Sequence, residues 1–233
     1  MSLWRLRRSS DLCSHRVLRI SLSGVVSPFL VCCCILLFCA DIVSSAEIVG
    51  NVAIVRGEVV CRRPGMSAAR TLKRGDTVQV ADLLETGKDG KVQILLSDDT
   101  VINLMPDSIL RISHYSYNRD TSRRSAVATV KQGTAHFIIY KELKEDSYVT
   151  VETEHALIQI RQADLVVVTS RQRTELYTLA GYSNIRNSSN LVVGNVTAGE
   201  NQSVVVQAKT PPTSPSVIPS LQRRKFIKDA RQL

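Results

Sequence analysis

The chain has 233 residues, of which 44% are hydrophobic, and it carries a formal net charge of +9. This length allows one well-cored domain or two small ones. Residues 1–46 carry +3 and residues 209–233 carry +5 of the charge, which leaves +1 on residues 47–208. Because a nucleic-acid-binding surface needs basic residues gathered on the folded part, the charge distribution argues against nucleic-acid partners.

Residues 1–46 have the organisation of a secretory signal peptide. Five arginines precede an apolar stretch without charge, Val25–Ala40. After this stretch, Ser44 and Ala46 supply small residues at the −3 and −1 positions of a cleavage site. A basic segment, an apolar segment and small residues before the cut are the three parts of such a peptide. We expect cleavage after Ala46, with Glu47 as the first residue of the mature protein.

The alternative for this segment is an uncleaved membrane anchor. Ile20–Ala40 has about the 20 residues that a bilayer crossing needs, and the arginine-rich flank would stay cytoplasmic. Ser27 and Pro28 interrupt the stretch and favour cleavage. Under either interpretation the rest of the chain is exported to the periplasm or cell envelope, anchored in the inner membrane only in the second.

Cys61 is the single cysteine that follows residue 46. A lone cysteine cannot form an internal disulfide or a metal site by itself. We interpret it as a small, half-buried residue in a strand.

Residues 47–208 are predicted to form an all-β domain. Short runs rich in Val, Ile, Leu and Thr recur between Gly, Asp, Asn and Ser, without a sustained helical period. The alternation of Val92, Ile94 and Leu96 is the clearest case of a half-buried strand. The expected strands are 53–61, 77–80, 83–85, 92–96, 101–104, 109–114, 126–131, 134–140, 148–152, 156–161, 164–170, 174–179, 182–187, 190–193 and 202–207. Their spacing predicts an antiparallel β-sandwich or roll.

Six acidic residues are concentrated between Leu72 and Leu104, and they could be a catalytic cluster or the turn residues of a sheet. They are Asp76, Asp82, Glu85, Asp89, Asp98 and Asp99. Most fall in segments typical of tight turns, namely "RGD", "TGKDG" and "SDDT". We therefore interpret them as turn residues, and Asp89-Gly90 between two apolar runs predicts a hairpin.

The order of these motifs resembles the FecR domain over roughly residues 46–187. The matching positions are Gly50, Gly57, Leu72, Gly75-Asp76, Asp82, Thr86-Gly87, Val92–Leu96, Asp98-Asp99-Thr100, Pro106–Leu110, Val130–Tyr140, Val149–Arg161 and Thr174–Ile185. The resemblance implies a jelly-roll-like all-β fold.

Two positions depart from the family pattern. Asp99 occupies the place of the usual Gly in "D-G-[ST]", so it must tolerate the backbone geometry that the Gly supplies. Arg161–Leu165 replaces the usual "R-G-T-x-F", which loses a Gly-Thr pair tied to a tight backbone approach. The fold should tolerate the second change, whereas a binding surface built around that turn would be altered.

In the best-known FecR proteins this domain is the extracytoplasmic part of a transmembrane regulator, which relays a signal from an outer-membrane receptor for iron complexes to a sigma factor. Those proteins have a cytoplasmic domain before the membrane segment. This chain has about 19 residues there, too few for a folded domain. We therefore do not expect direct control of a sigma factor.

Patterns for other chemistries are absent or incomplete in the sequence. "DLLETGKDGK" does not follow the EF-hand spacing, "TGKDGK" lacks the phosphate-loop ending, and no "G-x-S-x-G" occurs. His114, His136 and His155 fall in different predicted strands, where half-buried histidines are the simpler interpretation. We therefore expect no enzyme, and no catalytic, cofactor-binding or metal-binding residues.

Residues 209–233 are predicted to be a Pro-rich linker followed by a basic tail. Thr210–Ser220 contains four prolines and no charge, so it should be extended. Leu221–Leu233 could form a short amphipathic helix that touches an anionic membrane or a partner, or it could be a flexible, disordered tail.

Together these features predict a non-enzymatic FecR-like envelope protein that acts by binding, in signalling or as a structural module. Its partner would be an envelope protein, a glycan or a small ligand, with membrane contact through the N-terminal segment or the basic tail. The alternative is a membrane-tethered regulator of an extracytoplasmic signalling pathway, with the N-terminal anchor uncleaved.

Overall fold

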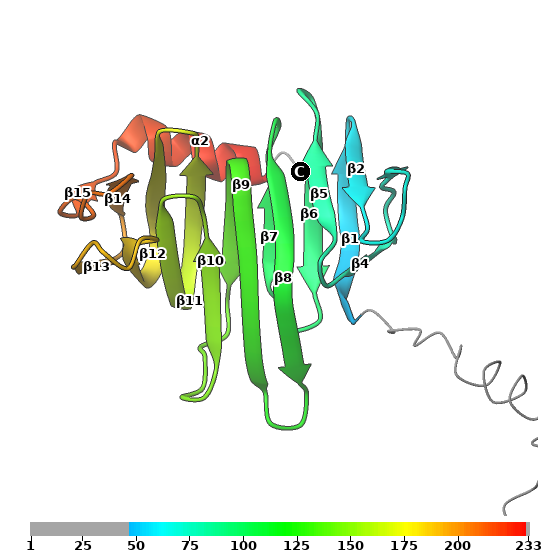
Figure 1. Cartoon of the computed structure of the whole chain (residues 1–233), viewed down its shortest axis with the longest axis horizontal. Coiled ribbons are helices and arrows are strands. Elements are labelled where there is room, and N and C mark those ends of the chain that lie inside the picture. Colours follow the sequence, from blue (N-terminus) through cyan, green and yellow to red (C-terminus); the bar gives the residue numbers. More distant parts are fainter. Residues whose placement is uncertain (1–46, 232–233) are drawn as a thin grey trace, which may run out of the picture. The chain divides into compact units, whose positions relative to one another are not determined.

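The computed structural model describes residues 47–231 (Figure 1). The signal peptide or anchor predicted for residues 1–46 lies outside these residues. The described residues form one compact unit with its own hydrophobic core. In the part of the chain that the structure describes, no helix has the length and apolar character needed to cross a membrane.

The described residues form fifteen strands and one helix, which confirms the predicted all-β fold. The elements are β1 (Ile48–Arg56), β2 (Val59–Arg62), β3 (Arg70–Thr71), β4 (Thr77–Gln79), β5 (Leu83–Thr86), β6 (Lys91–Leu96), β7 (Val101–Leu104), β8 (Ile109–Asn118), β9 (Arg123–Ile139), β10 (Tyr148–Glu152), β11 (Ala156–Thr169), β12 (Arg173–Asn187), β13 (Asn195–Ala198), β14 (Gln202–Gln207), β15 (Ser216–Val217) and α2 (Ser220–Arg231).

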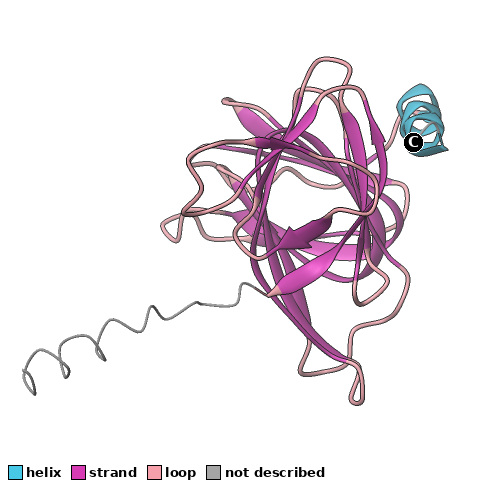
Figure 2. Cartoon of the chain, turned by 90° about the vertical axis from the view of Figure 1, so that its right-hand side faces the viewer, coloured by secondary structure: helices cyan, strands magenta, loops and turns pink. Residues whose placement is uncertain are grey.

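Three long strands pass from one layer of the roll to the other. The first layer is built around the second half of β9. On one side of it lie β7, β6, β1 and β4, and on the other side lie β11, β12, β14 and β15. The first half of β9 pairs with β8 and β10 and belongs to the second layer, with β5, β2, β3 and the other halves of β11 and β12. Figure 2 shows the two layers facing each other, with α2 outside them. The strand pairs are antiparallel except β9 with β10, which run parallel.

The bend in β9 lies at Gly133, where φ is +87°. A straight strand of its 17 residues would span about 55 Å, yet the Arg124 side chain near its start reaches the backbone carbonyl of Lys141 just after its end. A Cβ atom on residue 133 would lie 2.2 Å from Oγ of Ser108, so only glycine fits. The same Oγ accepts a hydrogen bond from the Thr134 amide at 2.8 Å, which gives Ser108 of the family-like segment Pro106–Leu110 a structural role.

The core lies between the two layers. In β6, Val92, Ile94 and Leu96 are buried and alternate with more exposed residues, as the sequence predicts. Cys61 in β2 is buried in the same core rather than half-buried, with 1% of its surface exposed. Burial and the neighbouring Asp82 carboxylate raise the pKa of the Cys61 thiol to about 11.

The hairpin predicted at Asp89-Gly90 is wrong, because β5 and β6 do not pair with each other. The turn instead carries the chain from one layer to the other and packs against the connection between β1 and β2. The Gly87 amide donates a hydrogen bond to the Glu58 carbonyl at 2.9 Å, and a Cβ atom on Gly90 would lie 2.1 Å from that carbonyl oxygen. Close backbone approach, rather than hairpin geometry, selects the glycine.

The segment after residue 208 is ordered, and of the two alternatives for the basic tail the structure has the helix rather than the flexible tail. β15 pairs with β14, and α2 packs on the outer face of the first layer (Figure 2). Ile218 and Phe226 form a second apolar cluster with Val166 and Leu179. This contact provides the tertiary packing that a helix of twelve residues needs.

Candidate functional site

The six acidic residues do not converge on one site. Five of the six pair with five different basic residues. The ion pairs are Asp76–Arg70, Asp82–Arg63, Glu85–Arg62, Asp98–Arg124 and Asp99–Lys141. Asp89 is exposed in its turn. These positions agree with the interpretation of the cluster as turn residues.

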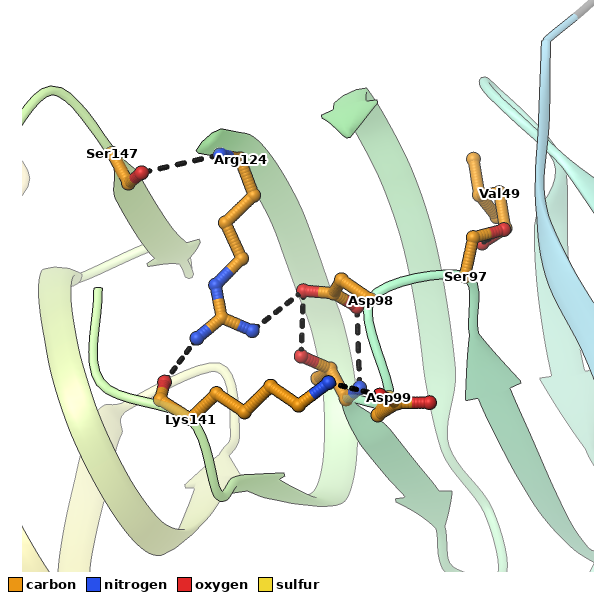
Figure 3. Close-up of polar contacts among 8 residues, drawn as sticks. Val49, Ser97, Asp98, Asp99, Arg124, Lys141 and Ser147 are labelled. Atoms are coloured by element: carbon orange, nitrogen blue, oxygen red, sulfur yellow. Dashed lines mark hydrogen bonds and ion pairs between the residues drawn. The ribbon is translucent and has the colours of Figure 1, made fainter. Parts of the chain in front are cut away.

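Two of these ion pairs involve a buried carboxylate. The Arg63 guanidinium binds both carboxylate oxygens of Asp82 at 2.9 Å. Arg124 binds Asp98 at 2.9 Å, and both side chains are almost fully buried (Figure 3). Because Asp98 lies between β6 and β7 whereas Arg124 begins β9, the second pair connects the two layers.

Asp99 adopts the backbone conformation that the family pattern assigns to glycine. Its φ is +68°, in the left-handed region, which Asp tolerates better than most residues. Its side chain is exposed and accepts a hydrogen bond from the Lys141 ammonium (Figure 3), which lowers the pKa of the Asp99 carboxyl. Asp99 therefore has the glycine-like backbone geometry that the family pattern predicts for this position.

The altered segment Arg161–Leu165 forms the bend of β11. The register with β12 shifts on both sides of Gln162 and Ala163. The tight backbone approach is retained, but its glycine comes from the opposite strand: Gly181 has φ +75°, and a Cβ atom there would lie 2.1 Å from the Gln162 carbonyl oxygen. This explains how the fold tolerates the loss of the Gly-Thr pair.

The three histidines have separate environments. His114 bonds Ser125 and stacks on Tyr148, and His155 contacts the carbonyl of Arg171. Between residues 47 and 231, no three His, Cys, Asp or Glu side chains gather in a way that could hold a metal ion.

His136 is the unusual one, because it belongs to a polar row on the outer face of the first layer. The pairing register places Gln93 of β6, Asn103 of β7 and His136 of β9 side by side. The apolar Val166 of β11 lies next to His136. His136 is 3% exposed, and its Nε2 bonds Oδ1 of Asp164 at 2.5 Å. Its Nδ1 is buried and has no hydrogen-bond partner among the described residues.

A pocket of about 320 Å³ lies between this row and α2. The sheet contributes Lys91, Met105 and His136, and α2 contributes Lys225, Phe226 and Asp229. In the described part of the chain, neither lysine nor Asp229 forms an ion pair with another residue. This pocket combines apolar walls with free charges, the composition of a small-molecule site.

Sequence reasoning placed His136 in a strand but missed this pocket. The alternation in β9 could indicate an outward-facing histidine. The contact with Asp164 depends on the pairing of strands 28 residues apart, and Lys225 and Phe226 enter the site only because α2 folds back.

The architecture defines a bent, two-layered β-roll. Residues 82–182 match the model of the FecR protein family, so this segment is a FecR domain, as the resemblance implies.

Two crystal structures of a proposed anti-sigma factor from Parabacteroides distasonis are similar to the chain. The identities are 14% and 13%, and the TM-scores 0.49 and 0.48. Each match covers 62% of this chain and 64% or 63% of the other, so the chain spans less than two thirds of those proteins. No curated protein matches the chain.

Proposed function

We propose that this chain is a non-enzymatic FecR-like module that works in the bacterial envelope by binding a protein, a glycan or a small ligand. The FecR domain over residues 82–182 is the observation that carries this proposal. In the best-known FecR proteins, the domain relays signals outside the cytoplasm. The apolar, uncharged stretch in residues 1–46 supports export of the domain that follows.

The distribution of the acidic residues favours binding over catalysis. Catalysis by paired carboxylates requires two groups in contrasting environments at one site. In this chain, the buried carboxylates of Asp82 and Asp98 are each neutralised by a different arginine. Their contacts support a structural role and leave the outer surfaces of the roll for recognition.

The ends of the first layer offer one mode of recognition. Its strand order runs from β15 to β4, so each of these short strands has a free edge. An exposed edge is a template for strand addition by a partner. The outer face beside α2 offers a second mode, through the pocket at His136.

A pull-down from envelope extract tests the proposal. The bait is the 47–233 protein, which contains all the described core, and heat-denatured bait is the control. We expect the folded bait to retain a discrete partner or ligand that the denatured bait does not. Retention of the same molecules by both baits would contradict specific recognition by the folded domain.

The second candidate is a membrane-tethered regulator, which the length of Ile20–Ala40 favours. Mass spectrometry of the protein from membranes separates the two candidates. Glu47 at the N-terminus excludes the tether, whereas a retained Met1 supports it.

Membrane contact through the basic helix is part of the same proposal. Arg224, Lys225 and Lys228 are exposed on α2, while Phe226 faces the sheet. Cationic side chains of this kind attract anionic lipid headgroups. We expect deletion of residues 210–233 to reduce sedimentation with vesicles of anionic lipid, and equal sedimentation of both forms would exclude this contact.

A further inference from the structure

The pocket beneath α2 has a net positive charge on its walls. Lys91 and Lys225 contribute two ammonium groups from opposite sides, against the single carboxylate of Asp229. Within the described residues all three lack an ion-pair partner, although Lys225 and Asp229 are one helical turn apart. An anion placed between the two lysines would therefore gain charge-assisted hydrogen bonds without breaking existing ones.

The remaining walls are apolar. Three buried side chains line the same space, namely Met105, Val166 and Phe226. A volume of about 320 Å³ is at the small end of the range for ligand pockets. The site thus suits a compact molecule with one apolar end and one anionic end.

His136 forms part of the same pocket wall and has an unusual hydrogen-bond balance. Buried polar atoms in folded proteins nearly always have a hydrogen-bond partner, but Nδ1 of His136 has none among the described residues. Asp164 holds the other ring nitrogen and so fixes the orientation of the imidazole.

We propose that this pocket binds a small organic acid, with its carboxylate between Lys91 and Lys225 and its apolar part against Phe226. The inference rests on the proposed binding role and names the ligand class for one surface. Because α2 provides one wall, an occupied pocket also holds α2 against the sheet. Ligand binding and docking of the C-terminal helix are therefore coupled.

Three probes with the same apolar body test the ligand class: hexanoate, 1-hexanol and hexylamine, titrated into the 47–233 protein and followed by NMR. We expect hexanoate to shift the signals around Phe226 and His136 and to bind about tenfold more tightly than 1-hexanol. Hexylamine should bind more weakly than either, since the lysines repel it. Hexanoate should also slow hydrogen exchange in α2.

Substitutions on one helix provide a matched control. Lys225→Gln should weaken hexanoate binding several-fold, whereas Lys228→Gln, which removes a charge from the exposed face of α2 outside the pocket, should leave it unchanged. Asp229→Asn should strengthen binding, because it removes the one negative wall charge.

The proposal is overturned if no probe binds, if hexanoate binds no better than 1-hexanol, or if the substitutions at 225 and 228 act equally. None of these outcomes bears on the pull-down, which can still retain a partner through another surface.

Discussion

The buried ion pair between Asp98 and Arg124 should be a main determinant of stability. The Arg124 guanidinium binds Asp98 and the Lys141 carbonyl (Figure 3), and the Arg124 side chain is 4% exposed. Arg124→Met keeps much of the side-chain volume but leaves the Asp98 carboxylate buried without a countercharge. Removing one partner of such a pair costs about 3–5 kcal/mol, a large part of the roughly 5–15 kcal/mol that stabilises a typical domain.

Equilibrium unfolding of the 47–233 protein in urea measures this loss. The midpoint should fall while the slope stays constant, because the surface exposed on unfolding is unchanged. Adding Asp98→Asn to Arg124→Met should recover part of the loss, since the uncompensated charge is gone. In the native protein the Thr100 amide and hydroxyl donate to the two carboxylate oxygens of Asp98 at 3.2 and 2.9 Å. After Asp98→Asn the amide oxygen can still accept from the Thr100 amide, and the new NH2 group can donate to the Thr100 hydroxyl oxygen.

The neighbouring pair provides the control. Lys141→Met removes the partner of Asp99 in the same turn, but the side chains of Lys141 and Asp99 are 61% and 64% exposed. Exposed ion pairs contribute little, because water solvates the separated charges, so the urea midpoint should not change measurably. If Arg124→Met and Lys141→Met had the same small effect, the argument that burial makes the Asp98 pair important would be refuted.

Three further substitutions or modifications test other parts of the fold. Gly90→Ala should cost more than about 2 kcal/mol in urea unfolding because its Cβ meets the Glu58 carbonyl; a loss equal to that of Gly199→Ala, whose Cβ would meet nothing closer than 3.5 Å, would contradict this. Phe226→Ala should release α2, seen as faster proteolysis there with β-sheet circular dichroism retained, whereas Leu221→Ala, 76% exposed, should not. At pH 8 iodoacetamide should alkylate Cys61 at least 100-fold more slowly in the folded 47–233 protein than in urea, since its raised pKa leaves roughly a hundredth of the usual thiolate; equal rates would show that the thiol is accessible.

Local patterns in the sequence predicted most of the strands, but not how the long ones continue. The strand expected at 190–193 is wrong, because this segment is a turn and β13 begins only at Asn195. The expected pairs of strands at 126–131 and 134–140, and at 174–179 and 182–187, are the two halves of β9 and of β12. A break between them was the natural prediction, because glycines mark the positions of the bends. Instead, Gly133 lets β9 cross from one layer to the other without ending, and Gly181 does the same for β12. A single-sequence pattern identifies such a glycine, but only the pairing partners decide between a turn and a bend.

The short elements at the C-terminal end were missed for a different reason. β15 has two residues, and it forms because the chain before α2 passes beside β14. In α2, basic residues surround the few apolar ones. The sequence alone therefore could not decide between a disordered tail and a short helix. Burial of Phe226 against Tyr177, with ring centroids 4.9 Å apart, favours the helix only after the sheet has formed. Tertiary packing, rather than helix propensity, therefore determines this segment.

Asp98 and Asp99 show how far sequence reasoning reaches within one turn. The pattern correctly predicted a turn and identified Asp99 as the residue in the position of a glycine, where φ is +68°. It could not predict that Asp98 is buried and Asp99 exposed, because that difference depends on the bend in β9 that brings Arg124 and the backbone of Lys141 together. The same bend places His136 on the outer face, under α2. A substitution that straightened β9 at Gly133 should therefore disrupt both the ion pair that joins the layers and the pocket proposed to bind an organic acid.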